Sequence, residues 1–516
     1  MTGQLLTAAF GAWARGRVGK VERLGRDPVE VQRKTLSRLL QAAAETSFGK
    51  EHAFRRITRH SGFASAVPVR RYAQFVPWID RQLSGEADVC WPGRPRYFAK
   101  TSGTTAGDKS IPVTEEMVGQ NRRAGRDILA FHLRNTPGSG ILGGRQLFLG
   151  GSTLLEPLPT GAFRGDLSGV MAREMPFYLR PGILPSPGVV AIAGWEKKLE
   201  AIAKESLSQD LRLIAGMPSW SLLLFEAWKR LSGGATVGEL FPRLELFVHG
   251  GVRYEPYQAP AEAAVGRGVR RLEVYPASEA FIAVQDAAPA DGLLLGLDYG
   301  TFYEFIPAAE AGSDSPRRLG IGDVSLGETY SIVLSNVAGL WAYEIGDLVR
   351  FVSITPPRLV VAGRTGHFSN CCGENLIVEE VEAGATTAAA ACRLPLGEFT
   401  VAPVYPDAVD SRPRLEWVVE LPDDEPFLEE PLLIAFDRTL RARNHDYDTK
   451  RTHDAGMLQP VLTVVPSGTF HAWLRSRGKL GGQNKVPRLM NDRSIVDSVL
   501  GAVRPGGHPL TDAPGR

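Results

Sequence analysis

The sequence has few cysteines, no excess of charge of either sign and no long apolar run. Four cysteines occur in 516 residues, and none of them has C-x-x-C or zinc-site spacing. Such low usage is typical of a reducing compartment, so we expect a cytoplasmic location. The formal net charge of +2 gives no electrostatic footprint for nucleic acid. No stretch reaches the roughly 20 apolar residues that span a bilayer, so we expect neither nucleic acid nor a membrane as a partner.

The overall composition is that of an ordinary globular protein. Hydrophobic residues make up 43% of the chain and charged residues 22%. A chain of this length exceeds one typical core, so we predict two or more domains. The N-terminal start, MTGQLLTAAFGAWARGR, places its arginines after the apolar run. A secretory signal has the opposite order, so this segment is predicted to be a helix.

Helical and strand patterns alternate through the first half of the chain. Residues 29–47 and 195–206 have the spacing of helices. Residues 211–216, 244–251 and 271–279 are apolar runs that end in Gly or a polar loop, which is typical of strands. This alternation predicts an α/β core, and ligands bind such cores where strands end in loops.

From about residue 293 the sequence becomes richer in β-branched and aromatic residues. Short runs of these residues with Gly breaks predict hairpins or a small barrel. We place a hinge at Gly366, with a large N-terminal domain at 1–366 and a smaller C-terminal domain at 367–516. The elements expected in the smaller domain are helices near 379–391 and 428–443 and strands near 399–404 and 415–421.

One short loop, TSGTTAG at 101–107, concentrates hydroxyl groups and glycines. Glycines let backbone amides turn toward a ligand, and hydroxyl groups add donors, so the composition suits an anion such as a polyphosphate. The spacing differs from the Walker loop, because three residues separate Gly103 from Gly107 and Lys109 follows an Asp. A plain turn has the same composition, so the loop by itself leaves both interpretations open.

Further motifs follow this loop in a definite order. They are HGG at 249–251, YPASE at 275–279, YEIGD at 343–347, GR at 363–364 and QNKVPR at 483–488. The ordered set resembles the adenylate-forming superfamily. With VPVRRYAQFVPWIDRQLSGE at 67–86 and SGTF at 467–470, it is similar to one branch, the auxin-responsive Gretchen Hagen family of acyl acid amido synthetases. That family has plant and bacterial members, and we expect a bacterial one here.

The resemblance implies both a fold and an activity. The fold is α/β, with α/β subdomains and a small β-barrel in a large N-terminal domain and a smaller, mobile α+β C-terminal domain. The activity is an AMP-forming ligase reaction: ATP, with Mg²⁺, adenylates a small carboxylic acid, and the acyl group passes to an amino acid as an amide. Two alternatives stay open, namely an acyl-CoA ligase, which shares the adenylation step, and a non-catalytic ligand-binding relative.

The resemblance also assigns roles to residues. Glu279 corresponds to the magnesium ligand of the family. A single carboxylate suits Mg²⁺, which prefers one or two carboxylates plus phosphate oxygens. Lys485 corresponds to a C-terminal lysine that neutralises charge during adenylation, so Glu279 and Lys485 are the candidate catalytic residues. The remaining ATP or AMP contacts are Ser102, Gly103, Thr104 and Thr105 at the phosphates, Gly250 and Gly251, Tyr275 on adenine, Ser278 at the α-phosphate, Asp347 on the ribose hydroxyls, and Arg364 near the same sugar.

Several of these residues have a structural alternative. Glu279 also fits a helix N-terminal acid, Asp347 fits a turn residue, and a Lys in a Gly-rich loop is usually solvated. His249, His367 and His445 titrate near neutrality, yet a structural role is more frequent for such residues, so we assign no general base.

Two positions depart from the plant pattern. Glu344 stands where Arg is usual, and Asn484 stands where Tyr is usual. Neither change removes a group that contacts ATP, but both point away from a plant-like choice of amino acid. The acyl pocket is expected to draw on residues 121–135 and 170–180, where Arg123, Arg126 and Tyr178 meet a carboxylate or ring or else lie on the surface.

Overall fold

The computed structural model shows a chain that folds into two compact units, Met1–Val361 and Ala362–Arg516. The structure describes residues 2–102, 108–150, 154–192, 195–251, 254–266, 268–313, 315–364, 368–369, 374, 376–395, 397–404, 413–422, 428–444, 447–448, 451–454, 457–478, 485–490 and 492–502.

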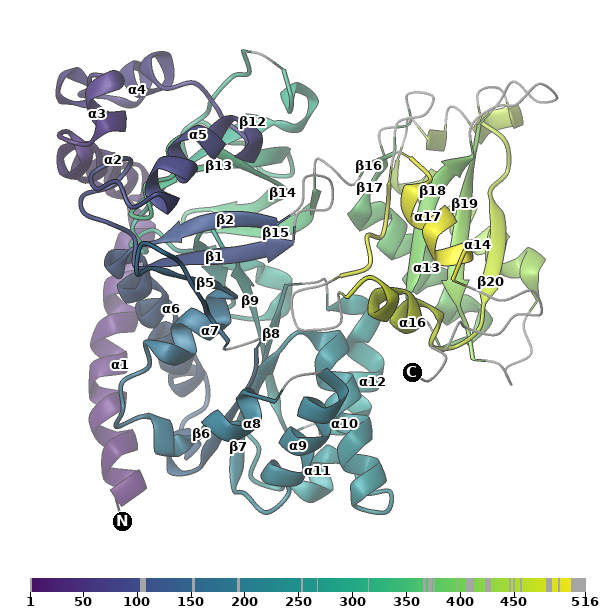
Figure 1. The fold of residues 1–516 in the computed structure, drawn as a ribbon. Helices are drawn as coiled ribbons and strands as arrows, with labels where there is room; N and C mark the ends of the chain where they lie inside the picture. The colour runs from purple at the N-terminus through teal and green to yellow at the C-terminus, as the bar shows by residue number, and fades with distance from the viewer. Residues whose placement is uncertain are drawn as a thin grey trace. The chain divides into compact units, whose positions relative to one another are not determined.

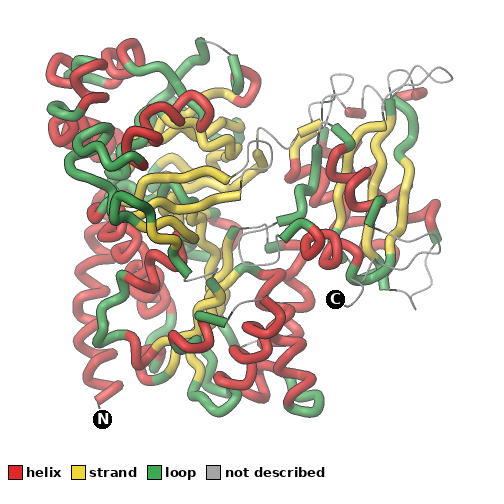
Figure 2. The backbone as a smooth tube through the Cα atoms, viewed as in Figure 1, coloured by secondary structure: helices red, strands yellow, loops and turns green. Residues whose placement is uncertain are grey.

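The larger unit is built on one long mixed sheet (Figures 1 and 2). Neighbouring strands run parallel from β6 through β3, β7 and β8 to β9, and the pairs β9–β10 and β10–β11 are antiparallel. The order among the described residues is β12 (Thr301–Pro307), β13 (Thr329–Asn336), β14 (Tyr343–Ile354), β15 (Pro357–Arg364), β11 (Leu293–Leu295), β10 (Phe281–Val284), β9 (Arg270–Pro276), β8 (Leu246–Gly250), β7 (Leu211–Gly216), β3 (Arg145–Leu149) and β6 (Ile183–Leu184).

Helices cover both faces of the parallel part of this sheet (Figure 1). Successive strand residues alternate between two cores: Leu213 packs in the cluster with α1 and α6, whereas Ile214 packs in the cluster with α9 and α10. Strands buried on both faces read as continuous apolar runs, which explains the sequence pattern at 211–216. The helices of this unit are α1 (Thr2–Arg26), α2 (Pro28–Ala43), α3 (Ser47–Glu51), α4 (His60–Ala66), α5 (Tyr72–Leu83), α6 (Glu115–Asn135), α7 (Leu167–Arg173), α8 (Pro187–Val190), α9 (Trp195–Ser206), α10 (Pro218–Leu231), α11 (Val237–Leu240) and α12 (Glu255–Val265).

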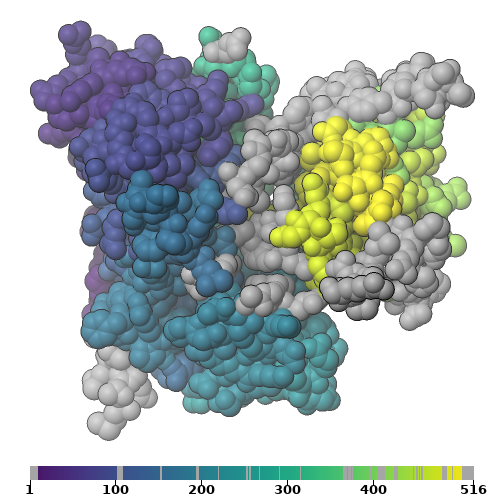
Figure 3. All heavy atoms as spheres, viewed as in Figure 1, coloured from purple at the N-terminus to yellow at the C-terminus, as the bar shows by residue number. Residues whose placement is uncertain are grey.

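A second, smaller sheet in this unit carries the hydroxyl-rich loop. Its order is β2 (Asp108–Val113), β1 (Tyr97–Ser102), β5 (Phe163–Gly165) and β4 (Glu156–Pro157). Tyr97 and Ala99 of β1 share one hydrophobic core with Ile282 of β10 and Tyr343 of β14. The small sheet therefore packs against the antiparallel part of the long sheet. In the space-filling view, the visible surface of this unit is mostly purple to dark blue at the top and teal at the bottom (Figure 3).

The strands after residue 293 form hairpins. β12 pairs antiparallel with β13, β13 with β14, and β11 with β15. In the described residues these strands extend the long sheet, whose order ends at β12. This segment is joined to the parallel strands because β11 pairs with both β10 and β15.

The smaller unit has a three-stranded sheet of β18 (Phe399–Val404), β19 (Arg414–Glu420) and β20 (Val461–Val465). Trp417 and Val419 of β19 face a core with α13 (Val378–Cys392) and α14 (Glu429–Arg443). Val418 faces the opposite core with α16 (Thr469–Ser476) and α17 (Ser494–Leu500). A short pair, β16 (Phe368–Ser369) and β17 (Leu376–Ile377), precedes α13. Of the helices that the structure describes in either unit, none has the length and apolar character of a membrane span.

Candidate functional site

The turn between β9 and β10 carries three of the predicted site residues. Tyr275 lies near the end of β9, and Ser278 and Glu279 lie in the turn itself. The amide of Ala277 donates to the carbonyl of Ala280 over 2.8 Å, which closes the turn. The turn lies at the end of a strand, as the sequence predicts, with Tyr275 and Glu279 buried and Ser278 partly buried.

Asn336, at the end of β13, fixes this turn from the other side and was not predicted from the sequence. Its Nδ2 donates to the carbonyl oxygen of Glu279 over 2.7 Å, and its Oδ1 accepts from the amide of Ala338 over 3.0 Å. Asn336 is only 2% exposed, so its hydrogen bond to the Glu279 carbonyl is shielded from water. The available signal was a polar residue ending the apolar run SIVLSN.

Tyr275 and Asp347 meet directly. The hydroxyl of Tyr275 donates to Oδ2 of Asp347 over 2.5 Å, although three strands separate β9 from β14 in the sheet order. In a flat sheet, strands four positions apart lie about 19 Å from each other, which is beyond the combined reach of Tyr and Asp side chains. The sheet must therefore curl between these strands, and this curl brings the two predicted nucleotide contacts together.

Asp347 is presented by a bulge in β14. Between the pairs Val333–Glu344 and Ser331–Leu348, β14 advances four residues while β13 advances two. Gly346, beside Asp347, has a φ of 85°, a value that Gly adopts without the steric cost that other residues incur. A bulge of this kind re-aims a side chain out of the regular alternation of a strand, which explains why Asp347 can reach Tyr275.

The end of β8 contributes Gly250 and Gly251 beside the same edge. Gly250 pairs with Val274 of β9, and a Cβ on Gly250 would lie 2.2 Å from the carbonyl oxygen of Val274. Only Gly permits this approach of the two strands. The neighbouring His249 is buried and stacks on Tyr254 with ring centroids 3.8 Å apart.

The hydroxyl-rich loop belongs to a different sheet from the other motifs. β1 and β2 form an antiparallel hairpin in which Thr101 pairs with Lys109 and Ser102 with Asp108. The loops at 249 and 276 follow β8 and β9 of the long sheet, and the hydroxyl-rich loop follows β1 of the four-stranded sheet. Gly103, Thr104 and Thr105, which join the two strands, lie outside the described residues.

The structure gives fewer details of the remaining predicted residues. Arg364 ends β15, and its side chain lies outside the described part. Lys485 is an exposed residue of the smaller unit. His367, His445 and Asn484 fall outside the described residues. Among the residues that the structure does describe, no group of three or more His, Cys, Asp or Glu side chains is arranged to hold a metal ion.

The arginines proposed for the acyl pocket have structural partners. Arg123 donates to the carbonyl of Asp298 over 2.9 Å, and the guanidinium of Arg126 lies 5.6 Å from the ring centre of Trp13. Tyr178 is 68% exposed. Of the two interpretations offered for Arg123 and Arg126, the structure therefore favours contacts with neighbouring residues over contacts with an acid.

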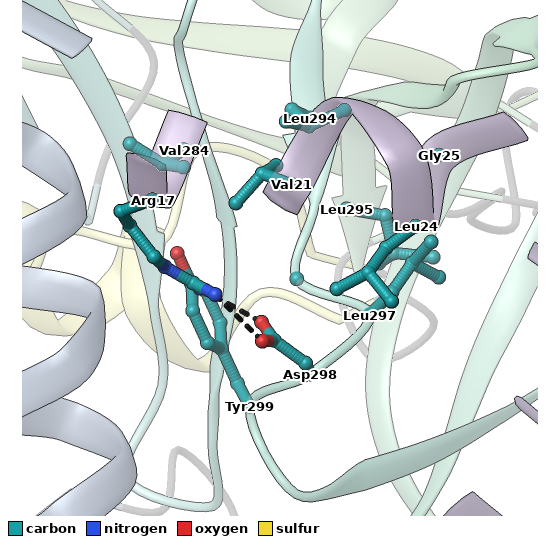
Figure 4. Close-up of a pocket in the computed structure, with 11 residues that line it drawn as sticks. Arg17, Val21, Leu24, Gly25, Val284, Leu294, Leu295, Leu297, Asp298 and Tyr299 are labelled. Atoms are coloured by element: carbon teal, nitrogen blue, oxygen red, sulfur yellow. Dashed lines mark hydrogen bonds and ion pairs between the residues drawn. The ribbon is translucent and has the colours of Figure 1, made fainter. Parts of the chain in front are cut away.

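A small pocket beside α1 is also structural in character (Figure 4). Its lining is mainly apolar, from α1, β10 and β11, and its polar end is formed by Arg17 and Asp298. Arg17 also binds the fully buried Asp127. Burial alone would lower the pKa of Arg17, but the carboxylates of Asp127 and Asp298 raise it. Arg17 pairs with both carboxylates, and its bond to Asp127 ties α1 to α6.

Three domain models of one family match the chain. They are the GH3 family N-terminal domain over residues 17–192, the GH3 family central domain over 294–364 and the GH3 family C-terminal domain over 379–494. The chain belongs to the GH3 family. Its membership confirms the resemblance drawn from the ordered motifs.

Two curated relatives match this chain over nearly their whole length. The chain is 23% identical to a jasmonoyl-L-amino acid synthetase of Nicotiana attenuata, JAR4, over 93% of this chain and 94% of that protein. It is 20% identical to an indole-3-acetic acid-amido synthetase of Arabidopsis thaliana, GH3.3, over 92% of each. These names agree with the amide-forming ligase class expected from the sequence.

Solved structures confirm the expected fold class. The GH3.15 acyl acid amido synthetase superposes with a TM-score of 0.78 at 17% identity, covering 94% of this chain and 95% of that one. A 2-hydroxyisobutyryl-CoA ligase in complex with an acyl-AMP, in the postadenylation state, gives a TM-score of 0.59 at 13% identity, covering 91% and 90%. The fold is therefore the mixed α/β fold of adenylate-forming ligases.

Within the GH3 family pattern, Glu344 has a clear structural role. Its side chain is 4% exposed and binds Nε of Arg71 over 2.6 Å. It also accepts from the hydroxyl of Ser331 over 2.7 Å. Glu344 stands where plant members of the family have Arg, and its negative charge is paired with an arginine from another segment of the chain.

Proposed function

We propose that this protein is an ATP-dependent acyl acid amido synthetase. It adenylates a carboxylic acid, releasing pyrophosphate, and transfers the acyl group to the amine of an amino acid. The observation that carries the proposal is the contact of Tyr275 with Asp347 beside a turn that contains Glu279, in a chain of the GH3 family. Positioning and charge neutralisation are what phosphoryl chemistry requires of a protein.

The nucleotide lies along the strand ends in this proposal. Tyr275 stacks on adenine, Asp347 accepts hydrogen bonds from the ribose hydroxyls, and Arg364 lies near the same sugar. Gly250 and Gly251 contact the nucleotide at the end of β8. Ser278 contacts the α-phosphate from the turn.

The hairpin tip between β1 and β2 holds the β- and γ-phosphates. Ser102, Thr104 and Thr105 supply hydroxyl donors, and Gly103 leaves its amide open to an anion. The antiparallel pairing of Ser102 with Asp108 supports this role, because it fixes both ends of the loop.

Magnesium fits the residues present. The ion prefers one or two carboxylates with phosphate oxygens and water, so it does not need a cluster of three protein ligands. Glu279, whose backbone Asn336 holds, would bind it. When bound, the ion offsets the negative charge of the phosphates.

The smaller domain closes over the larger one during the reaction. We place the domains at 1–366 and 367–516, close to the two units of the fold. Lys485 would neutralise the carboxylate and α-phosphate while the adenylate forms. Closure excludes water and protects the adenylate from hydrolysis.

The substrates are small molecules. The relatives named for jasmonoyl and indole-3-acetic acid conjugation, and the GH3.15 structure solved with 2,4-DB, support an acyl acid and an amino acid as the partners here. A bacterial source is supported by the departures at Glu344 and Asn484. The scarcity of cysteine supports a cytoplasmic location.

Exchange of pyrophosphate into ATP tests the first half-reaction, with a panel of aromatic, fatty and hydroxylated acids in the presence of Mg²⁺. Exchange above the protein-free control is expected with at least one acid; none at all, or release of ADP in place of AMP, contradicts adenylation.

With that acid, twenty amino acids and coenzyme A are then offered in parallel and the products identified by mass. An amide is expected, with a rate that climbs from about pH 7 to 9 because the protonated α-amine is not nucleophilic. A coenzyme A thioester alone would identify an acyl-CoA ligase.

A further inference from the structure

The segment Arg70–Arg71–Tyr72, which we call the strap, leads into α5, whose first residue is Tyr72, and is bonded to β14 through its backbone. The amide of Arg70 donates to the carbonyl of Ala342 over 3.0 Å, and the amide of Glu344 donates to the carbonyl of Arg70 over 2.9 Å. These two bonds form an isolated parallel bridge between Arg70 and Tyr343. The strap therefore fixes the part of β14 that precedes the bulge.

The side chain of Arg71 strengthens this connection through Glu344. The Glu344 carboxylate is 4% exposed, while the Arg71 side chain is 51% exposed. A carboxylate this deeply buried is costly unless it is paired, and removing its partner leaves an uncompensated charge. The Glu344 side of this ion pair is thus buried, and the Arg71 side is accessible to solvent.

Ser331 closes the bulge at its base. Its backbone pairs with Leu348, directly after the bulge, and its hydroxyl donates to Oε1 of Glu344, directly before the bulge. Both ends of the segment that presents Asp347 are therefore tied to one residue of β13. Only two residues, Ile345 and Gly346, separate Glu344 from Asp347 along the backbone.

The other end of the strap contacts β2, in the hairpin of β1 and β2 to which the proposed function assigns the phosphates. The hydroxyl of Tyr72 accepts from the amide of Ser110 in β2 over 2.8 Å. Nζ of Lys109 lies 5.5 Å from the centre of the Tyr72 ring. Because β2 pairs with the end of β1 at Ser102, the strap connects two segments that belong to different sheets.

We propose that the strap, through the Arg71–Glu344 ion pair, positions Asp347 against the ribose and sets its distance from β2. Arg71 and Glu344 are positioning residues, because they act through Asp347 and the strand backbone. The inference rests on the proposed function, in which Asp347 binds the ribose hydroxyls. A displacement of about 1 Å at such a site is enough to cost two orders of magnitude in rate.

The test measures nucleotide binding and needs no acyl acid. The dissociation constants of AMP and 2′-deoxy-AMP are determined by calorimetry for the wild type and for the single variants Asp347→Ala, Arg71→Gln and Glu344→Gln. The control is Arg33→Ala, which removes a guanidinium whose Nε lies 2.6 Å from a carboxylate oxygen of Glu30, the same separation as in the strap. Thermal midpoints are recorded for each variant.

We expect the wild type to prefer AMP and Asp347→Ala to lose that preference. Arg71→Gln and Glu344→Gln should each reduce the preference about 2- to 10-fold, the range of one hydrogen bond, and Arg33→Ala should leave it unchanged. The exchanged pair Arg71→Glu with Glu344→Arg should recover part of what Glu344→Arg alone loses. Should Glu344→Gln fail to fold, Arg71→Gln still removes the ion pair, because it changes the exposed partner.

Three outcomes overturn the inference. An unchanged preference in Arg71→Gln, with the preference abolished in Asp347→Ala, shows that the strap does not position Asp347 while the ribose assignment stands. A lowered thermal midpoint with an unchanged preference assigns the ion pair to stability alone. An unchanged preference in Asp347→Ala removes the ribose assignment itself, and the inference with it.

Discussion

At the scale of single residues, the buried carboxylates fall into two groups. Asp127 and Glu304 are inaccessible and are held by Arg17 and Arg318 at 2.5 and 2.6 Å. Such pairs hold segments of the fold together, because an unpaired charge in the interior is strongly unfavourable. Glu279 differs, since it lies in a turn at a strand end, where a metal ion and phosphate oxygens can share it.

Glu279→Gln should slow adenylation with little effect on the fold. Losing one preorganised electrostatic contact costs about 10²–10³ in rate, or roughly 3–4 kcal/mol of barrier. Pyrophosphate exchange as a function of Mg²⁺ concentration measures the loss, and thermal denaturation checks the fold. The control is Glu226→Gln, an exposed carboxylate on α10. Unchanged exchange and an unchanged Mg²⁺ requirement would make Glu279 a structural residue.

His52 should make the free energy of unfolding depend on pH. Burial lowers the pKa of His52 from its ordinary value of 6.5. Its Nδ1 lies 3.0 Å from the carbonyl oxygen of Phe48, and its Nε2 lies 3.0 Å from a nitrogen of Arg70, so the neutral ring donates to Phe48 and accepts from Arg70. The unfolded chain binds a proton near pH 6.5 and the folded chain does so only at lower pH, so stability falls as the pH drops below about 6.5.

Denaturant unfolding at pH 7.5 and 5.5 measures this effect in the wild type and in His52→Gln. The variant should lose less stability on acidification, by at most about 1.4 kcal/mol per pH unit for one proton. Equal slopes in the two proteins would contradict a neutral, buried His52.

At the scale of elements, the approach of β8 to β9 decides how the strand ends form one edge. Gly250→Ala should destabilise the protein, because its Cβ would overlap the carbonyl oxygen of Val274 at 2.2 Å. Overpacking of this kind typically costs about 1–3 kcal/mol. Nucleotide binding should weaken as well, since Val274 precedes Tyr275.

Gly125→Ala is the matched control for that substitution. Gly125 lies inside α6, and a Cβ there meets nothing within 4 Å. Replacing a helical Gly with Ala should stabilise the protein by roughly 0.5–1 kcal/mol. Denaturant unfolding compares the two variants, and a Gly250→Ala protein as stable as the wild type would show that β8 and β9 can separate without cost.

At the scale of the whole molecule, two units share one reaction in the proposed function. Lys485→Ala should slow formation of the adenylate and spare transfer from an acyl-AMP that is supplied directly, because the lysine neutralises charge only while the carboxylate attacks the α-phosphate. Pyrophosphate exchange and amide formation from synthetic acyl-AMP separate the two steps. Arg438→Ala, an exposed cation on α14, serves as the control. An equal loss in both steps would contradict a role confined to adenylation.

Local periodicity predicted the elements well. The helix expected at 195–206 is α9, and the strands expected near 399–404 and 415–421 are β18 and β19 within one residue. The apolar spacing of such segments is set by neighbours a few residues apart, so the sequence alone determines it. The turn at 276–280 and the loop at 249–251 were located for the same reason.

The contacts that build the site depended on the tertiary structure. Tyr275 meets Asp347 because the sheet curls across three intervening strands, and Asn336 reaches Glu279 from a strand distant in sequence. How the strands after residue 293 join the long sheet depended on the pairing of β11 with β10 and β15, which no local pattern specifies. The sequence by itself determined the family, the elements and the order of the motifs; only the tertiary structure decided which of them touch, because the bulge in β14, the curl of the sheet and the Arg71–Glu344 pair join residues that the chain keeps far apart.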